Sequence, residues 1–451
     1  MGVMPVNKLL ISMALPMIIS MLVQALYNIV DSMYVSQLSE YALTAVSLAF
    51  PAQNLMIGIA TGTGVGVASL LSRSLGEKNY EKANTVAGNS FLLAIASWLL
   101  LVVFGLFFSK MYFRGQTEVV EIAAMGVTYL RIVTVASLGI FVEIAMERLL
   151  QSTGRTMLSM VVQLVGAIIN IILDPILIFG RYGFPEMGIA GAAVATVIGQ
   201  IVAMIIAIIL NLALNKEIKF AKKYLKADRQ IIKEVYIIGF PSILMVAIGS
   251  LMTFSLNKIL GIFTSTAVAV FGAYYKLQSF VFMPLFGLNN GLVPIVAYNL
   301  GARKKDRIVK VIKLAMIYAV GLMMFGFVTF QYVPEALLSL FNASDEMIEI
   351  GVPALRTLSL SYIFAGICIV SASVFQALDK SIYSLLMSAA RQLIVLIPVA
   401  YLLSLTGVLD YVWWSFPIAE VVSLAVSLLL LRKVMRDVSR VMDTPFESSA
   451  N

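Results

Sequence analysis

The segment Asn170-Ile171-Ile172-Leu173-Asp174-Pro175 lies inside an apolar run from about 157 to 179, long enough to cross a bilayer as a helix. A carboxylate at membrane depth is costly unless it is bonded, so Asp174 is a candidate functional residue. Pro175 removes a hydrogen bond to the carbonyl of Ile171, which is left free beside the acid. These oxygens and the amide of Asn170 can together hold a proton or a small hard cation. In the alternative interpretation, Pro175 simply ends the helix and the acid marks that end.

The composition around this segment is that of a membrane protein. Of 451 residues, 60% are hydrophobic and 12% charged, and the charges lie between long apolar runs. In a membrane protein, a net charge of +8 reflects how the chain is oriented in the bilayer, and we therefore expect no nucleic-acid partner. The absence of histidine excludes bis-His haem and most zinc enzymes, which leaves carboxylates as candidate proton carriers. A single cysteine, Cys368, excludes an intrachain disulfide. The N-terminal apolar run continues too far for a cleaved signal peptide.

Hydropathy predicts an all-α polytopic membrane protein with twelve spans, near residues 9–34, 44–71, 86–109, 122–146, 157–180, 188–214, 232–259, 266–298, 308–332, 348–375, 382–405 and 411–431. With the N-terminus inside, 24 of the 32 Lys and Arg residues fall in inner segments and three in outer ones. The positive-inside rule therefore predicts an inner (plasma) membrane protein with both termini cytoplasmic. The basic segment between spans six and seven is predicted to be a solvated linker that contacts anionic lipid headgroups.

The two halves of the chain repeat with an offset of 225 residues. This offset superposes Pro16 on Pro241, Gln53 on Gln278, and Leu75-Gly76 on Leu300-Gly301. We therefore expect an N-lobe (1–214), a cytoplasmic basic linker (215–231) and a C-lobe (232–451). Six spans in each lobe predict a pseudo-two-fold axis along the membrane normal, a central binding cavity and alternating access by rocking of the lobes.

Proline and glycine recur at particular places in these spans. Pro16 and Pro241 are expected to break the first helix of each lobe and, with Pro175, to act as hinges. In the second span, Gly58, Gly62, Gly64 and Gly66 favour close helix packing.

A second acid, Asp31, lies in the first span. It is about 35 Å along the helix from Lys8, and Asp174 is about 28 Å from Arg155, so both are expected at a similar depth in the outer part of the N-lobe. Gln24 and Asn28 precede Asp31 at helical spacing on one polar face. Two carboxylates in such a pocket raise each other's proton affinity, which favours coupling to H⁺ or Na⁺. The alternative for Asp31 is an acid that reaches the outer interface.

The C-lobe does not repeat these acids, because Leu256 and Val399 stand at the matching positions. Its candidate charges are Lys276 and Arg391, and we favour a structural pair of Arg391 with Glu420 over a substrate role. Methionine and aromatic side chains suit a cavity for flat lipophilic cations, although packing explains most of them. The residues expected to line the cavity are Gln24, Tyr27, Asn28, Met33, Gln53, Lys276, Gln278, Phe282, Asn289 and Arg391.

Several motifs make the chain similar to the multidrug and toxic compound extrusion (MATE) family over nearly its full length. They are Leu15-Pro16, Tyr27-Asn28-Ile29-Val30-Asp31, Ser74-Leu75-Gly76, Asn299-Leu300-Gly301, Gln151-Ser152-Thr153-Gly154 and the segment 170–175. The resemblance implies cation-driven export of drugs and organic cations from a central cavity. It also implies cation coupling at Asp31, Asn170 and Asp174, with Thr196 a looser match. Acids that some members carry in spans seven and ten are missing, which places the chain near the DinF and MepA branch.

Three functions remain to be compared. The first is export of lipophilic or cationic small molecules by a monomer in exchange for H⁺ or Na⁺, with no other cofactor. The second is a flippase for lipid-linked glycan precursors, supported by Lys276 and Arg391, which can meet pyrophosphate. The third is a membrane-embedded enzyme, which the sequence disfavours, because it shows no nucleophile elbow and no metal-ligand cluster. The sequence shows no Walker A motif, so ATP is not the expected energy source.

Overall fold

The computed structural model describes residues 1–341 and 343–443, and the regular elements in these ranges are all helices. The first half holds α1 (Val6–Ser36), α2 (Glu40–Gly76), α3 (Tyr80–Val103), η1 (Phe104–Phe108), α4 (Ser109–Arg114), α5 (Val120–Val135), α6 (Leu138–Ser152), α7 (Thr156–Phe179), η2 (Arg181–Gly183) and α8 (Ile189–Leu214). After η3 (Lys222–Tyr224), the second half holds α9 (Arg229–Gly261), α10 (Ser265–Gly301), α11 (Lys305–Tyr332), α12 (Pro334–Ser339), α13 (Asp345–Ser359), α14 (Tyr362–Ala377), α15 (Ser381–Ala389), η4 (Ala390–Leu396), α16 (Ile397–Ser404), α17 (Leu409–Trp413) and α18 (Ser415–Asp443).

Ten helical segments of the described chain are long and apolar enough to cross a membrane, and two bent helix pairs bring the number to twelve. The bent pairs are α5 with α6, at 43°, and α13 with α14, at 49°. Twelve spans agree with the prediction from hydropathy. The fourth span runs to Ser152, beyond its predicted end at residue 146, which brings further polar residues into the helix.

The internal repeat is visible in the helix bounds. α2 and α10 begin and end at positions that differ by 225 residues, and so do α7 and the segment Ser381–Ser404. Matching N-caps fix two of these helix starts, because the hydroxyl of Ser39 accepts from the backbone of Ala42 and that of Thr264 accepts from the backbone of Thr266. The sequence repeat is therefore a structural repeat.

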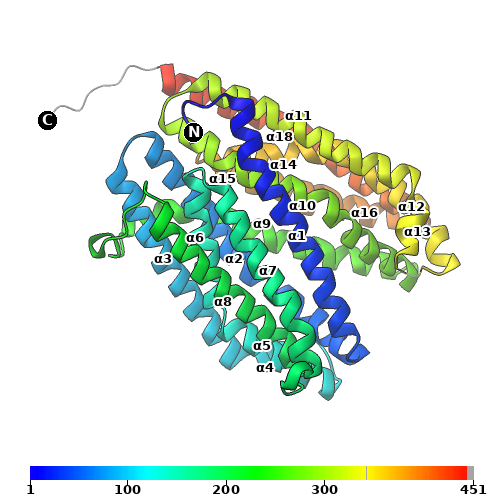
Figure 1. The fold of residues 1–451 in the computed structure, drawn as a ribbon. Coiled ribbons are helices and arrows are strands. Elements are labelled where there is room, and N and C mark those ends of the chain that lie inside the picture. Colours follow the sequence, from blue (N-terminus) through cyan, green and yellow to red (C-terminus); the bar gives the residue numbers. More distant parts are fainter. Residues whose placement is uncertain (342, 444–451) are drawn as a thin grey trace.

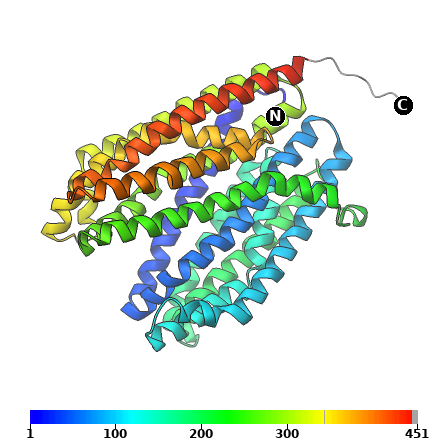
Figure 2. The same ribbon diagram turned by 180° about the vertical axis from the view of Figure 1, so that it is seen from behind.

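Two six-span lobes, the N-lobe (α1–α8) and the C-lobe (α9–α18), lie side by side (Figure 1). We call the end of the molecule where α1 begins and α2, α10 and α18 end the basic end. The lobes meet at the basic end and diverge toward the opposite, far end (Figures 1 and 2). Each lobe has its own apolar core, and the first turns of α1 pack into the core of the C-lobe.

Glycines bring the lobes together at matching crossings. A Cβ on Gly62 of α2 would lie 2.5 Å from the side chain of Ile243 in α9. A Cβ on its repeat equivalent, Gly287 of α10, would lie 2.6 Å from the backbone of Ile18 in α1. Gly58 and Gly66 also face α9, and Gly64 faces α6. The predicted close packing at these glycines is confirmed, and most of it lies between the lobes.

The prolines do not end their helices. α1 runs without a break through Pro16, and α9 does so through Pro241, so the expected breaks at these two positions are wrong. Neighbouring groups explain why α1 can continue. Pro16 leaves the carbonyl of Ser12 without its helical donor, and the hydroxyl of Thr156 in α7 donates to that carbonyl at 3.3 Å. α7 likewise continues past Pro175 to Phe179.

The basic linker is exposed over most of its length, as predicted, and is tied to the N-lobe by hydrogen bonds. The backbone N–H of Lys219 donates to Asn84 at 2.8 Å, and that of Asp228 donates to Asn89 at 2.9 Å. Asn89 in turn donates to the carbonyl of Lys226. These contacts hold both sides of η3 on α3, so the linker fixes where α9 begins.

Candidate functional site

Asp174 and Asn170 lie one helical turn apart on the buried face of α7, and Asp174 is fully buried. In the orientation that satisfies its neighbours, the Asn170 amide donates to Asp174 Oδ2 at 3.0 Å. Its carbonyl oxygen accepts from the backbone N–H of Thr196 in α8 at 3.0 Å and from the Thr196 hydroxyl at 3.2 Å. Thr196, placed only by resemblance, therefore belongs to the same cluster.

Asp31 of α1 completes this cluster. It lies close enough to Asp174 to act on it electrostatically, and the Tyr27 hydroxyl lies within range of both acids and beside Thr196. Asp31 Oδ1 and Asp174 Oδ1 are buried, and neither meets a hydrogen-bond donor in the part of the chain that the structure describes. Two unpartnered carboxylate oxygens at membrane depth can be satisfied by a proton or by a small cation.

The polar residues of the first span differ in their exposure. Tyr27 and Asp31 turn toward α7 and α8, whereas Gln24 and Asn28 are exposed, as is Met33 with 57% of its surface. Gln53 of α2 reaches the cluster indirectly, because its amide donates to the hydroxyl of Tyr129 at 3.1 Å.

Sequence reasoning missed Tyr129, which is buried in α5 within electrostatic range of Asp31 and Asp174. An aromatic residue in an apolar span gave no sign of this role.

The C-lobe candidates do not form a comparable cluster. Arg391 donates to Glu420 Oε1 at 2.7 Å, which confirms the predicted structural pair. Phe282 packs edge-on against Tyr362, with ring centroids 5.4 Å apart. The remaining candidates lie along α10, where Lys276 is exposed, Gln278 is half-buried and Asn289 is buried. Within the described part of the chain, several candidate residues therefore meet in the N-lobe cluster, whereas those of the C-lobe do not.

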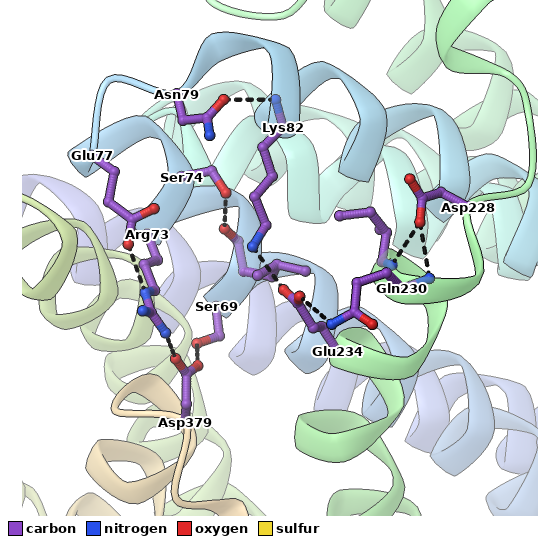
Figure 3. Close-up of polar contacts among 12 residues, drawn as sticks. Ser69, Arg73, Ser74, Glu77, Asn79, Lys82, Asp228, Gln230, Glu234 and Asp379 are labelled. Atoms are coloured by element: carbon purple, nitrogen blue, oxygen red, sulfur yellow. Dashed lines mark hydrogen bonds and ion pairs between the residues drawn. The ribbon is translucent and has the colours of Figure 1, made fainter. Parts of the chain in front are cut away.

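Ion pairs join the lobes at the basic end (Figure 3). Arg73 at the end of α2 pairs with Asp379 in the loop between α14 and α15, and Ser69 donates to Asp379 as well. Lys82 of α3 pairs with Glu234 of α9 at 2.7 Å. Burial raises the pKa of the Asp379 carboxyl, and the guanidinium of Arg73 acts in the opposite direction. The charged form of Asp379 therefore depends on Arg73.

Replacing Arg73 with alanine is expected to weaken closure of the basic end about tenfold, because the change leaves Asp379 buried without its cation. Distances between spin labels on the two lobes measure the closed population. Glu81→Cys on α3 and Arg432→Cys on α18 provide exposed labelling sites at the basic end, and the native Cys368 is buried. The double variant Arg73→Ala/Asp379→Asn should recover part of the closure. A closed population unchanged in Arg73→Ala would contradict a gating role for this pair.

Comparisons with known proteins match both lobes of this fold. The MatE family model matches residues 16–176 and 241–402, once in each lobe. The multidrug export protein MepA of Staphylococcus aureus (strain MRSA252) is 28% identical over 435 residues, which cover 96% of this chain and 95% of MepA. MepA of Staphylococcus haemolyticus is 27% identical over 420 residues, or 92% of this chain and 91% of that protein.

Solved structures show the same fold. A multidrug resistance MATE family transporter of the MOP superfamily, solved in an outward-facing conformation, superposes with a TM-score of 0.90 at 24% identity, covering 96% of this chain and 97% of that one. A MOP superfamily transporter from Pyrococcus furiosus superposes with a TM-score of 0.91 at 25% identity and the same coverage.

Proposed function

Because the chain belongs to the MatE family of membrane transporters, we propose that it exports lipophilic and cationic small molecules in exchange for H⁺ or Na⁺. The observation that carries this proposal is the buried cluster of Asp31, Asn170, Asp174 and Thr196, with one unpartnered oxygen on each acid. The similarity to MepA over nearly the whole chain supports drugs as the exported compounds.

The proposed cycle follows from the arrangement of the lobes. The excess of Lys and Arg at the basic end supports a cytoplasmic location for this end and for both termini. With the basic ends in contact, the cluster near the far end of the N-lobe would exchange its ion with the outside. Parting of the basic ends would then give substrate access from the cytoplasm, which is the alternating access expected of two rocking lobes.

The flippase alternative rests on cationic side chains that can meet pyrophosphate. Arg391 is bonded to Glu420, which reduces the positive charge that it can offer to a ligand. That leaves Lys276 as the support for this function, and we therefore favour export.

Ethidium efflux from energised vesicles that carry the wild-type protein tests the proposal. The pH gradient and the Na⁺ gradient are collapsed separately, and empty vesicles give the background. We expect efflux to stop when one of the two gradients is removed, which identifies the coupling ion. Efflux at background level under every gradient would refute export of this substrate and would favour the flippase.

A further inference from the structure

A further buried carboxylate lies in the N-lobe, outside the cluster of Asp31 and Asp174. Glu147 of α6 is 4% exposed, and its Oε2 accepts from the amide of Gln163 in α7 at 2.8 Å. Its other oxygen, Oε1, is buried and has no hydrogen-bond partner among the described residues, and the same holds for the carbonyl oxygen Oε1 of Gln163. Two acceptor oxygens are thus left unsatisfied around one existing hydrogen bond.

One proton would satisfy both oxygens. A protonated Glu147 can donate from Oε1 to the amide oxygen of Gln163, while the amide N–H continues to donate to Oε2. This is the paired arrangement of a carboxylic acid and an amide. A charged Glu147 would instead leave a buried carboxylate oxygen and a buried carbonyl oxygen without donors, and each such group is costly.

The charged and titratable groups that act on Glu147 are Glu143, one turn away, and Arg148, both in α6. Arg148 is occupied elsewhere, because its Nη1 donates to Gln151 at 2.8 Å and to Asn290 of α10 at 3.0 Å. Among the described residues, no cation forms an ion pair with Glu147. The side chains that α7 and α10 place in this region, Gln163 and Asn290, are amides. The contact to Asn290 also joins α6 to the C-lobe beside Glu147.

Glu147 lies at a different depth from the first cluster. It is about 7–8 Å from the end of α6 at the basic end, whereas Asp174 is about 27 Å from the start of α7 at the same end. Glu143 lies between them, since it is within electrostatic range of Glu147 and of Tyr27. Tyr27 in turn lies within range of Asp31 and Asp174. These titratable groups therefore form a series through the N-lobe, from Glu147 near the basic end to Asp31 and Asp174 toward the far end.

We propose that Glu147, paired with Gln163, is a second proton-binding site of the N-lobe, near its basic end. The site holds its proton while the lobes are in contact there. When the lobes part, the contact from Arg148 to Asn290 breaks, water reaches the neighbouring Glu147, and the proton leaves to that side. The inference deepens the proposed exchange of substrate for H⁺ by adding a release site for the proton.

Infrared difference spectroscopy of the full chain in lipid detects the proton directly. The background variant Asp31→Asn/Asp174→Asn removes the acids of the first cluster. We expect a neutral carboxyl C=O stretching band to remain in this background and to disappear when Glu147→Gln is added. Gln163→Leu should shift the band to higher frequency, because it removes the amide partner, and this variant covers the case in which Glu147→Gln does not fold. Glu217→Gln, at an exposed carboxylate on the same side, is the matched control and should leave the band unchanged.

Spin-label distances between Glu81→Cys and Arg432→Cys test the link to movement. In the wild type, raising the pH should increase the open population at the basic end. Glu147→Gln should make that population several-fold less sensitive to pH, and Glu217→Gln should behave as wild type. The proposal is overturned if no neutral carboxyl band depends on Glu147, or if Glu147→Gln keeps the full pH response. Neither readout uses ethidium, so failure of the proposed drug export is distinguished from failure of this site.

Discussion

Asp174→Asn is expected to lower ion-driven ethidium efflux about a hundredfold or more, which corresponds to about 2.7 kcal/mol or more. The side chain keeps its size but loses its charge and its ability to exchange a proton. Asp174 is fully buried, and Asn170 and Thr196 hold its surroundings in place, so the variant is expected to fold and to bind ethidium near the wild-type affinity. A loss of efflux with retained binding separates the coupling step from substrate recognition.

The measurement is the initial rate of ethidium efflux under the gradient that drives the wild type, with ethidium binding measured by fluorescence anisotropy. Asp31→Asn should give a loss of the same kind, because both acids contribute an unpartnered oxygen to the cluster. Asp410→Asn, which changes an acid of α17 in the other lobe, is the control and should retain efflux. Intact efflux in both Asp31→Asn and Asp174→Asn would exclude this cluster as the coupling site.

Much of this cluster could be predicted from the sequence, because an acid in an apolar run has few explanations. Asp31 and Asp174 were found in this way, and helix rise alone placed them at a similar depth. The contact between Asn170 and Thr196 could not be predicted from hydropathy and helix rise, because it depends on how α7 packs against α8. Hydropathy and the repeat predicted twelve spans, but not which polar side chains of α1 are exposed. Gln24, Asn28 and Asp31 share one polar face by spacing, and only the packed structure shows that Gln24 and Asn28 are exposed while Asp31 joins the cluster.

Glu147 was missed for a different reason. The predicted fourth span ended at residue 146, so it included Glu143 but assigned Glu147 and Arg148 to the cytoplasmic side. In the structure, α6 continues to Ser152, so both acids lie within the helix. Their spacing of four residues in an apolar segment was the available signal. Charged residues near a predicted helix end cannot be assigned to solvent by hydropathy alone.

Gly76→Ala and Gly301→Ala are each expected to disfavour closure of the basic end by about 1–3 kcal/mol, or about 5- to 150-fold in population. These glycines are repeat equivalents that end α2 and α10 against each other. A Cβ on Gly76 would lie 2.1 Å from the carbonyl oxygen of Tyr298, and one on Gly301 would lie 2.2 Å from that of Arg73. Because both opposing atoms belong to backbone, the clash can be relieved only by moving the helices apart.

The same spin-label pair at the basic end measures this effect, and the efflux rate should fall with the closed population. Gly272→Ala in α10 is the matched control, because a Cβ there meets no atom within 4 Å and alanine favours the helix. Equal distances in Gly76→Ala, Gly301→Ala and Gly272→Ala would show that the contact does not limit closure. An increase in the open population with both inter-lobe variants is the expected result, and it would show that each half of the repeat contributes one glycine to the same gate. The positions of these two glycines would then follow from the pseudo-two-fold symmetry of the lobes.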